Sequence, residues 1–354
     1  MKEPSVLILY SLPAPFFPDG TPDVFGQESV LSRLHAVQQA LLSSGYPVQA
    51  LEAKGDVAVL LKKMRSAKAD LVFNLCEEFH GRTKLEMNIA ALLELLDIPF
   101  TGSSALVLGL SQDKGKTKSI LAHGGISTPA YCVWQPGMDR RLSGLRFPLI
   151  IKPLLEDASL GIDNDAYIPD EKTLKQQVQK VHQGYGQVLV EEYIEGRELN
   201  VSILGNKSAQ VLPISEIDFS SMPPGLPRIC SYAAKWVESS REFSSTVPRC
   251  PASLPSRVEG EVKQVSLEAY RIMDCRDYAR VDIRLSPEGT PYVLEINANP
   301  DISPDAGMTR SAKMAGYSYP EFIALMVEIS WTRNGSLRSR GRPRRASRQK
   351  ETRG

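Results

Sequence analysis

The sequence predicts an α/β protein that begins with a parallel β-sheet. Three short apolar runs, residues 6–10, 47–51 and 70–75, alternate with two segments of helical periodicity, residues 27–43 and 57–67. This β-α-β-α-β order is typical of parallel strands connected by helices. Later in the chain, β-rich runs follow one another directly, which favours antiparallel pairing. With 354 residues, the chain is long enough for two or three domains with a large core.

Each of the other elements is predicted from its own pattern. Residues 84–96 form a strongly apolar helical segment closed by Asp97 and Pro99. A cationic helix start at residues 113–118 precedes a double-glycine stop. The remaining expected helices are residues 174–182, 257–273 and 319–329. The remaining expected strands are residues 148–152, 188–194, 198–204, 210–217, 279–285 and 292–297.

Two segments are expected to be irregular. Residues 220–254 contain five prolines and are predicted to be a long loop of the kind that often serves as a functional lid. Residues 331–354 are predicted to be a disordered basic tail, because from Arg333 onward there are nine Lys or Arg and a single acid, Glu351. The tail is either a solvated extension or a weak contact for nucleic acid or another anionic surface.

The most informative residues lie in the two β-rich runs nearest the C-terminus. Asp282 lies in residues 279–285, and Glu295 and Asn297 lie in residues 292–297, with a Pro- and Gly-containing turn between the runs. If the runs pair, three oxygen-bearing side chains can converge, since Glu295 and Asn297 face the same side of a strand. Carboxylate and amide oxygens are ligands that Mg²⁺ prefers, and Mg²⁺ commonly accompanies nucleotide phosphates. The alternative is a surface hairpin whose polar residues face water.

Two lysines and a loop of small residues could contact phosphate. Lys152 ends an apolar strand, so its ammonium is held on a rigid element and suits phosphate oxygens. Residues 156–161 are mostly small, which would let backbone N–H groups approach a phosphate. Lys114 is a second candidate phosphate contact. The alternatives are a plain turn for the loop and a helix-surface charge for Lys114.

Acidic residues at the end of another apolar strand could contact a nucleoside. Glu191 and Glu192 follow Val188 to Val190, and carboxylates or backbone groups there could read an adenine amino edge. Glu198, a short turn later, could accept hydrogen bonds from ribose hydroxyls. The alternative is an exposed acidic strand end.

Together these residues resemble those of the ATP-grasp ligases, and among them the D-alanine–D-alanine ligases. The similarity spans residues 6–329 and is most specific in three stretches. They are residues 92–103 (LLELLDIPFTGS), residues 113–118 with Asp113-Lys114 and Thr117-Lys118, and residues 293–300 (VLEINANP). The resemblance implies an N-terminal α/β domain at residues 1–105, followed by two ATP-grasp subdomains at residues 106–187 and 188–330 that clamp the nucleotide.

The resemblance also implies how ATP and metal are held. Lys114 and Lys152 would bind the ATP phosphates, and Glu198 would bind the ribose. The adenine would be held by Glu191, Glu192, Tyr193 and Ile194. Asp282, Glu295 and Asn297 would bind two Mg²⁺ ions, or Mn²⁺ in their place.

Four further residues are expected to act on the substrates. Arg280 would face the acyl phosphate and the oxyanion, and Lys235 would close on the γ-phosphate from the mobile loop. Glu28 would hold the ammonium of the first amino acid. Ser159 is the one hydroxyl kept in the small-residue loop, where the family usually has Gly-Ser-Ser.

The chain departs from the family pattern where the second substrate would bind. Trp236 replaces the usual tyrosine of the mobile loop. After Asn299-Pro300 the family typically has glycine, then Met-Thr, and this chain has Asp301 to Met308 there instead. We therefore expect intact ATP and metal handling, but an altered acceptor pocket.

Composition excludes several classes of protein. The net charge of +1 predicts no strong preference for polyanions or acidic membranes. The five cysteines match no zinc or disulfide pattern, so they read as free thiols in a reducing compartment. No apolar run approaches the ~20 residues of a membrane span, and no signal peptide is recognisable. A cytoplasmic protein is expected, and the resemblance implies a homodimer that acts on small amino acids or carboxylates.

We therefore expect an ATP-dependent carboxylate–amine ligase that forms an amide bond through an acyl phosphate. The alternative is a catalytically inactive ATP-binding module with a regulatory or scaffolding role. Retention of Arg280 argues against that alternative, because a module that only binds ATP would not need this residue.

Overall fold

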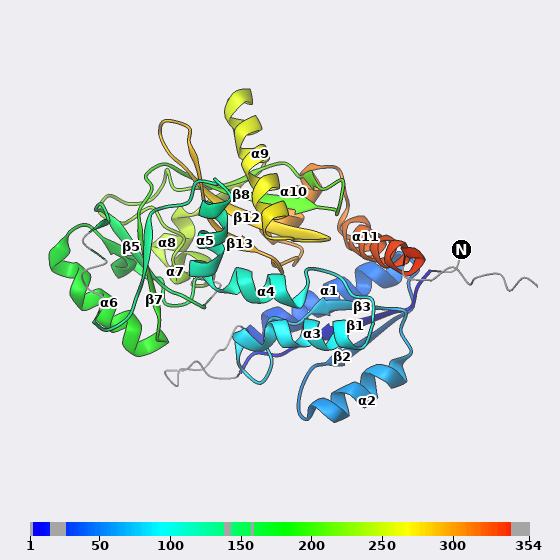
Figure 1. Ribbon diagram of the computed structural model, residues 1–354. Helices are drawn as coiled ribbons and strands as arrows, with labels where there is room; N and C mark the ends of the chain where they lie inside the picture. Colours follow the sequence, from blue (N-terminus) through cyan, green and yellow to red (C-terminus); the bar gives the residue numbers. More distant parts are fainter. Residues whose placement is uncertain (1–2, 15–25, 138–141, 143, 157–158, 341–354) are drawn as a thin grey trace, which may run out of the picture.

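The computed structural model describes residues 3–14, 26–137, 142, 144–156 and 159–340, and these residues form three β-sheets. In Figure 1 the N-terminal sheet lies at the right, the six-stranded sheet in the middle and the four-stranded sheet at the left. The first sheet is parallel and the other two are antiparallel. The predicted α/β fold, with a parallel sheet followed by antiparallel sheets, is confirmed.

The N-terminal sheet has the predicted β-α-β-α-β order, with β1 in the centre and β2 and β3 on either side. All five residues of β3 are buried, as expected for a strand with both faces covered. Leu34 and Val37 of α1 pack in one apolar cluster with Phe322 and Met326 from near the C-terminus. The elements are β1 (Val6–Tyr10), α1 (Gly26–Ser43), β2 (Val48–Glu52), α2 (Val57–Ala67), β3 (Leu71–Leu75), η1 (Thr83–Leu85) and α3 (Glu86–Leu95).

The four-stranded sheet has the order β4-β7-β5-β6, and α6 packs its apolar face, with Leu174 and Val178, against it. Two consecutive helices, α4 and α5, lead into this sheet. The elements are α4 (Ala105–Gln112), α5 (Lys114–His123), β4 (Tyr131–Trp134), β5 (Leu149–Pro153), η3 (Asn164–Ala166), β6 (Tyr167–Ile168), α6 (Glu171–Tyr185) and β7 (Val188–Glu192).

The six-stranded sheet has the order β11-β10-β8-β12-β13, with β9 paired to β8. Helix α9 packs on it through Val262 and Ala269. The elements are β8 (Arg197–Leu204), β9 (Gln210–Val211), β10 (Ser215–Asp218), β11 (Val247–Arg249), α9 (Ser256–Ile272), β12 (Tyr278–Leu285), β13 (Pro291–Asn297), α10 (Gly307–Met314) and α11 (Tyr319–Arg340).

The segment predicted to be a long loop is more ordered than its proline content indicates. Residues 220–254 contain two short helices, α7 (Tyr232–Trp236) and α8 (Arg241–Ser245), and the strand β11. Ser231 and Ser240 cap the two helices by accepting hydrogen bonds from backbone N–H groups. The loop predicted over residues 220–254 is therefore interrupted by these three short elements, and its helices form where a serine can cap them.

The prediction of disorder from residue 331 was wrong for the part that the structure describes, because α11 continues to Arg340. Arg333 donates hydrogen bonds to both oxygens of the buried Asp277, at 2.9 Å each, and to the carbonyl of Phe100. A basic residue counted as part of a solvated tail thus pairs with a buried carboxylate. The rest of the predicted tail, residues 341–354, lies outside the described residues.

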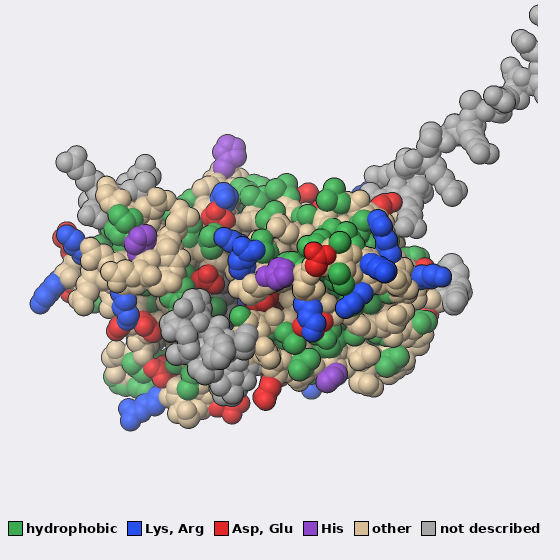
Figure 2. Space-filling view, turned by 90° about the horizontal axis from the view of Figure 1, so that it is seen from below, with side chains coloured by type: hydrophobic (Ala, Val, Ile, Leu, Met, Phe, Trp, Pro, Cys, Tyr) green, Lys and Arg blue, Asp and Glu red, His purple; other side chains and the backbone are tan. Residues whose placement is uncertain are grey.

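Charges on the surface are mixed. On the face drawn in Figure 2, acidic and basic side chains lie interspersed rather than gathered by sign. Among the described residues, no helix is long and apolar enough to cross a membrane.

Candidate active site

Strands β12 and β13 pair as predicted and bring the three oxygen-bearing side chains together. Asp282 lies opposite Glu295, and Arg280 lies opposite Asn297. The Asn297 Nδ2 donates a hydrogen bond of 3.0 Å to Asp282 Oδ2. The register shifts between Asp282 and Ile283, which leaves Leu294 as the extra residue of a β-bulge. Bulges of this kind commonly re-aim side chains beside active sites.

The Asp282 carboxylate is held by donors on both oxygens. Arg280 donates from Nε to Oδ1 and from Nη2 to Oδ2, both at 2.7 Å. Asn200 on β8 adds a 2.8 Å hydrogen bond to Oδ1, and Asn297 adds its bond to Oδ2. Each oxygen therefore accepts two hydrogen bonds, so a metal ion at Asp282 would have to displace one of these donors.

Four cations act electrostatically on Glu295. Lys114 Nζ lies 3.9 Å from Glu295 Oε2, and Lys152, Lys235 and Arg280 also act on this carboxylate. Burial by itself would raise the pKa of Glu295, but the four cations outweigh it and lower the pKa to about 2. Glu295, a predicted metal ligand, thus shares one electrostatic site with the predicted phosphate-binding residues Lys114 and Lys152. The site also includes Lys235 and Arg280, which were predicted to act on the γ-phosphate and the oxyanion.

Local capping explains where Lys114 lies. Asp113 caps α5 by accepting a 3.0 Å hydrogen bond from the Lys116 backbone, so Lys114 occupies the first helical position. Its ammonium donates a hydrogen bond to the carbonyl of Glu156, next to the small-residue loop. Asp157 and Ala158 of that loop lie outside the described residues.

A buried ionic triad lies beside this site. Glu191 Oε1 lies 2.6 Å from Lys152 Nζ, and Glu191 Oε2 lies 2.7 Å from Lys118 Nζ. The side chain of Glu191 is only 1% exposed. Sequence analysis assigned Glu191 to adenine and gave Lys118 no role.

The predicted adenine-binding residues separate onto two faces of the chain. The Glu192 side chain is tied to Arg146, which donates from Nε and Nη2, while Glu191 faces the two lysines. The carbonyl of Ile194 accepts a 3.0 Å hydrogen bond from Arg284 Nε. The structure therefore brings Glu191 to the cationic site and keeps the Glu192 side chain away from it.

Arg284, which sequence analysis missed, organises the segment after β7. This buried guanidinium donates to the Tyr193 hydroxyl at 2.8 Å and to Glu198 Oε2 at 3.3 Å, and it lies 4.9 Å from the centre of the Tyr193 ring. The pKa of Glu198 is raised, mainly because the carboxyl group is buried. The positive charge of Arg284 lowers this pKa in part, and the negative charge of Asp282 raises it further. Arg284 lies two residues beyond Asp282 on one strand, so strand alternation could have identified it.

Two expected catalytic residues, Ser159 and Lys235, lie on the small-residue loop and on the lid segment, residues 220–254. Ser159 Oγ donates a 2.8 Å hydrogen bond to the carbonyl of Cys230, one residue before the cap of α7. Lys235 on α7 is exposed, and its charge acts on Glu295. The structure thus places both residues beside the site, on segments that approach it from opposite parts of the chain.

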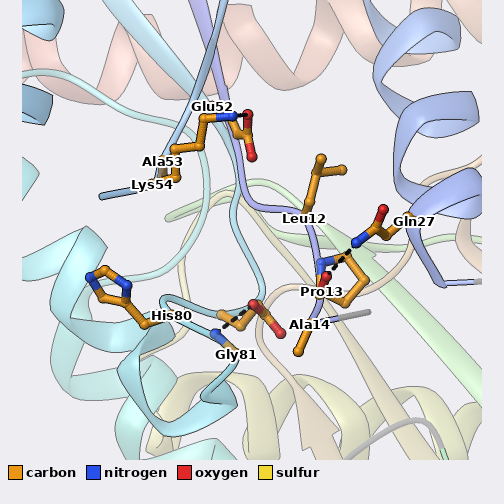
Figure 3. Close-up of a pocket in the computed structure, with 10 residues that line it drawn as sticks. Leu12, Pro13, Ala14, Gln27, Glu52, Ala53, Lys54, His80 and Gly81 are labelled. Carbon is orange, nitrogen blue, oxygen red and sulfur yellow. Dashed lines mark hydrogen bonds and ion pairs between the residues drawn. The ribbon is translucent and has the colours of Figure 1, made fainter. Parts of the chain in front are cut away.

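Glu28 lies apart from the other predicted residues, exposed in the first turn of α1. Its neighbour Gln27 lines a pocket of about 410 Å³ at the carboxyl ends of β1 and β2, where open α/β sheets commonly bind ligands. Figure 3 shows Lys54, His80 and Gln27 around this pocket. The pocket belongs to the N-terminal sheet, whereas the cationic site lies on the two antiparallel sheets.

Asp301, the departure noted in the sequence, is held by a buried arginine. Its Oδ1 accepts hydrogen bonds from Ser303 and from Arg33 Nη1, which also bonds Glu77. Burial by itself would raise the pKa of Asp301, but Arg33 and Ser303 lower it, so the carboxylate stays ionised at neutral pH. Sequence analysis missed Arg33, because its place on a helix predicts a surface charge.

The donor set fits a magnesium–nucleotide complex. Glu295 stays ionised and its side chain keeps 27% exposure, while Asn297 uses Nδ2 for Asp282 and leaves its amide oxygen for another partner. Among the described residues, no three His, Cys, Asp or Glu side chains gather as a metal site of their own. Mg²⁺ commonly uses one or two carboxylates and completes its shell with phosphates and water, so these side chains fit an ion that binds together with a nucleotide.

Comparisons with known proteins identify the family of the chain. The family model described as D-ala D-ala ligase C-terminus matches residues 133–328. A Sinorhizobium fredii protein, described only as uncharacterized protein y4sG, is 33% identical over 85% of this chain and 89% of its own length. A Bordetella petrii D-alanine–D-alanine ligase is 33% identical over 82% of this chain and 84% of its own length.

Solved structures show the same fold. A Bacillus anthracis D-alanine–D-alanine ligase complexed with ATP superposes with a TM-score of 0.74. The match covers 95% of this chain and 100% of that chain, at 24% sequence identity. Together with the family model and the relatives at 33% identity, this likeness shows that the architecture is ATP-grasp. The chain therefore belongs to the D-alanine–D-alanine ligase family of ATP-grasp ligases.

Proposed function

We propose that this ligase joins a small amino acid or other carboxylate to an amine through an acyl phosphate, at the expense of ATP. The observation that carries the proposal is the cationic site: four positive side chains act on Glu295, and Asp282 and Asn297 lie beside it on the paired strands. Charge in phosphoryl transfer is spread over the phosphoryl oxygens, so positioning and cations do most of the catalytic work.

In this proposal Lys114, Lys152 and Lys235 bind the transferred phosphate and the ATP phosphates. Asp282, Glu295 and Asn297 would hold the magnesium ions, two in number, with Mn²⁺ as a substitute. A bound divalent ion supplies Lewis-acid neutralisation of phosphate charge. The backbone of residues 191–194 would hold the adenine, and Glu198 would hold the ribose. The side chain of Glu191 serves its ion pairs with the two lysines, and that of Glu192 serves its ion pair with Arg146.

Arg280 is proposed to neutralise the oxyanion that forms when the amine attacks the acyl carbon. Well-placed donors of this kind contribute about 3–4 kcal/mol elsewhere. Arg280 spans both oxygens of Asp282 and is therefore held in one orientation. Ser159 and the lid segment would exclude water from the acyl phosphate, and Glu28 would bind the ammonium of the first substrate.

The other parts of the proposal follow from the family. The domain boundaries at residues 105, 187 and 330, a homodimer and a cytoplasmic location are proposed on that basis. Residues 341–354, which carry most of the basic charge behind the nucleic-acid alternative, lie outside the described residues. The inactive-module alternative is disfavoured, because Arg280, Lys235 and the oxygen donors share one site.

Hydroxylamine trapping tests the proposed reaction. A candidate carboxylate, ATP and Mg²⁺ should give a hydroxamate without any acceptor amine, because hydroxylamine captures an acyl phosphate. D-alanine is the first donor to test, followed by a panel of small amino acids. Nucleotide binding without hydroxamate from any donor would favour the inactive module instead.

A further inference from the structure

Lys118 is a buried charge that the proposed function does not use. It lies on α5 in the second half of the Thr117-Lys118 motif, and its side chain is 0% exposed. Its ammonium contacts Glu191 at 2.7 Å and the Thr128 hydroxyl at 2.8 Å, and lies 5.8 Å from the centre of the Tyr131 ring. These contacts enclose Lys118, so it cannot reach a nucleotide.

The two lysines that share Glu191 differ in what else they face. Glu295 acts on both lysines, but Lys152 also faces Lys114 of the cationic site. The side chain of Lys152 is 10% exposed, whereas that of Lys118 is fully buried. Lys118 is instead tied to Thr128, in the short connection between α5 and β4. Lys152 therefore lies on the side of the cationic site, and Lys118 lies on the interior side, where Thr128 holds it.

We infer that Lys118 is a positioning residue: it is the permanent counter-ion of Glu191, and it allows Lys152 to leave Glu191 for the phosphates of the nucleotide. This inference rests on the proposed function, in which Lys152 binds phosphate. A buried carboxylate without a cation is strongly unfavourable. Without Lys118, the movement of Lys152 toward phosphate would leave Glu191 in that state.

A purely structural role for Lys118 predicts something different. If the pair only stabilised the fold, its loss would lower stability and leave the nucleotide affinity of the folded protein unchanged. If Lys118 frees Lys152, its loss weakens nucleotide binding, and removing the charge of Glu191 as well restores much of it. The double variant therefore separates the two roles.

The experiment is calorimetric titration of Mg-ATP into the full chain carrying Lys118→Met, Lys118→Met with Glu191→Gln, or Lys116→Met. Lys116 is the matched control, because it lies on the same helix with a side chain that is 66% exposed. We expect Lys118→Met to weaken Mg-ATP binding about 10- to 100-fold, and the double variant to bind at least about fivefold more tightly than Lys118→Met. Lys116→Met should bind like the wild type.

Several results would overturn the inference. They are wild-type affinity in folded Lys118→Met, or a folded double variant that binds no better than Lys118→Met. If Lys118→Met does not fold, the double variant carries the test alone, and a loss of more than about 100-fold there counts against the inference. If the Mg-ATP affinities are as expected but no hydroxamate forms, only the proposed reaction is refuted. A wild type that binds no Mg-ATP would refute both the proposed function and this inference.

Discussion

Replacing Glu295 with glutamine tests whether one carboxylate balances the cations of the site. Lys114 lies 3.9 Å from Glu295, and Lys152, Lys235 and Arg280 act on it as well. They outweigh burial and lower the pKa of Glu295 from 4.5 to about 2. Since one pKa unit corresponds to about 1.4 kcal/mol, the surroundings favour the ionised carboxylate by roughly 3 kcal/mol.

The glutamine variant should therefore be roughly 3 kcal/mol less stable than the wild type at pH 7, because the cations lose their counter-charge. A lowered pKa contributes stability that is present above the pKa of the unfolded glutamate and is lost as the pH falls through the folded value. The difference should thus shrink to roughly half at pH 3. Urea unfolding at the two pH values measures it.

Nucleotide binding gives the second readout of the same variant. Because Glu295 no longer neutralises the cations, the variant should bind metal-free ATP more tightly than the wild type and lose the gain that Mg²⁺ provides. Turnover should be abolished. Glu288→Gln is the matched control, since Glu288 lies exposed in the turn between the same two strands. The reasoning would be refuted if Glu295→Gln were as stable as Glu288→Gln at both pH values and released phosphate from ATP at the normal rate.

Three further predictions concern the tail, the acceptor and the lid. Ending the chain before Arg333 should lower the free energy of unfolding by about 3–5 kcal/mol, because the buried Asp277 loses its cation. Ending the chain after residue 340 should change stability and activity little. Chemical unfolding of the two truncated proteins measures the difference. Asp301→Gly should change the ratio of kcat/KM between acceptor amines by at least about tenfold, because it removes the charged group held by Arg33 near the site. Unchanged kcat/KM ratios across the acceptor panel would contradict this. Ser159→Ala should lower kcat and hydroxamate yield severalfold by releasing the lid backbone, at a stability cost of about 1 kcal/mol, and unchanged values of both would contradict a role in closure.

The strand pair that carries the site could be predicted from the sequence, because alternation and a turn of Pro and Gly specify both strands and their pairing. The bulge at Leu294 could not, since an extra residue in a strand leaves the apolar pattern nearly unchanged. The helix at residues 307–314 was missed as well, because only a few of its residues are apolar.

Buried charged residues are the part of the candidate site that could not be predicted from the sequence. Lys118 and Arg33 lie on helices, where a charged residue ordinarily predicts a solvent-facing side. Their burial depends on partners distant in sequence, Glu191 for one and Glu77 with Asp301 for the other. The same holds for Arg333, which pairs with a carboxylate 56 residues away. Local patterns contain no signal for such pairs.

Counting bound Mn²⁺ tests the central claim most directly, namely that Asp282, Glu295 and Asn297 gather divalent ions around a bound nucleotide. Equilibrium dialysis with electron paramagnetic resonance measures the Mn²⁺ held per chain at saturating ATP, after subtraction of the ion bound to free nucleotide. The account predicts two ions per wild-type chain and a loss of at least one in Glu295→Gln. No protein-bound ion in the wild type, or a count that Glu295→Gln leaves unchanged, would contradict it.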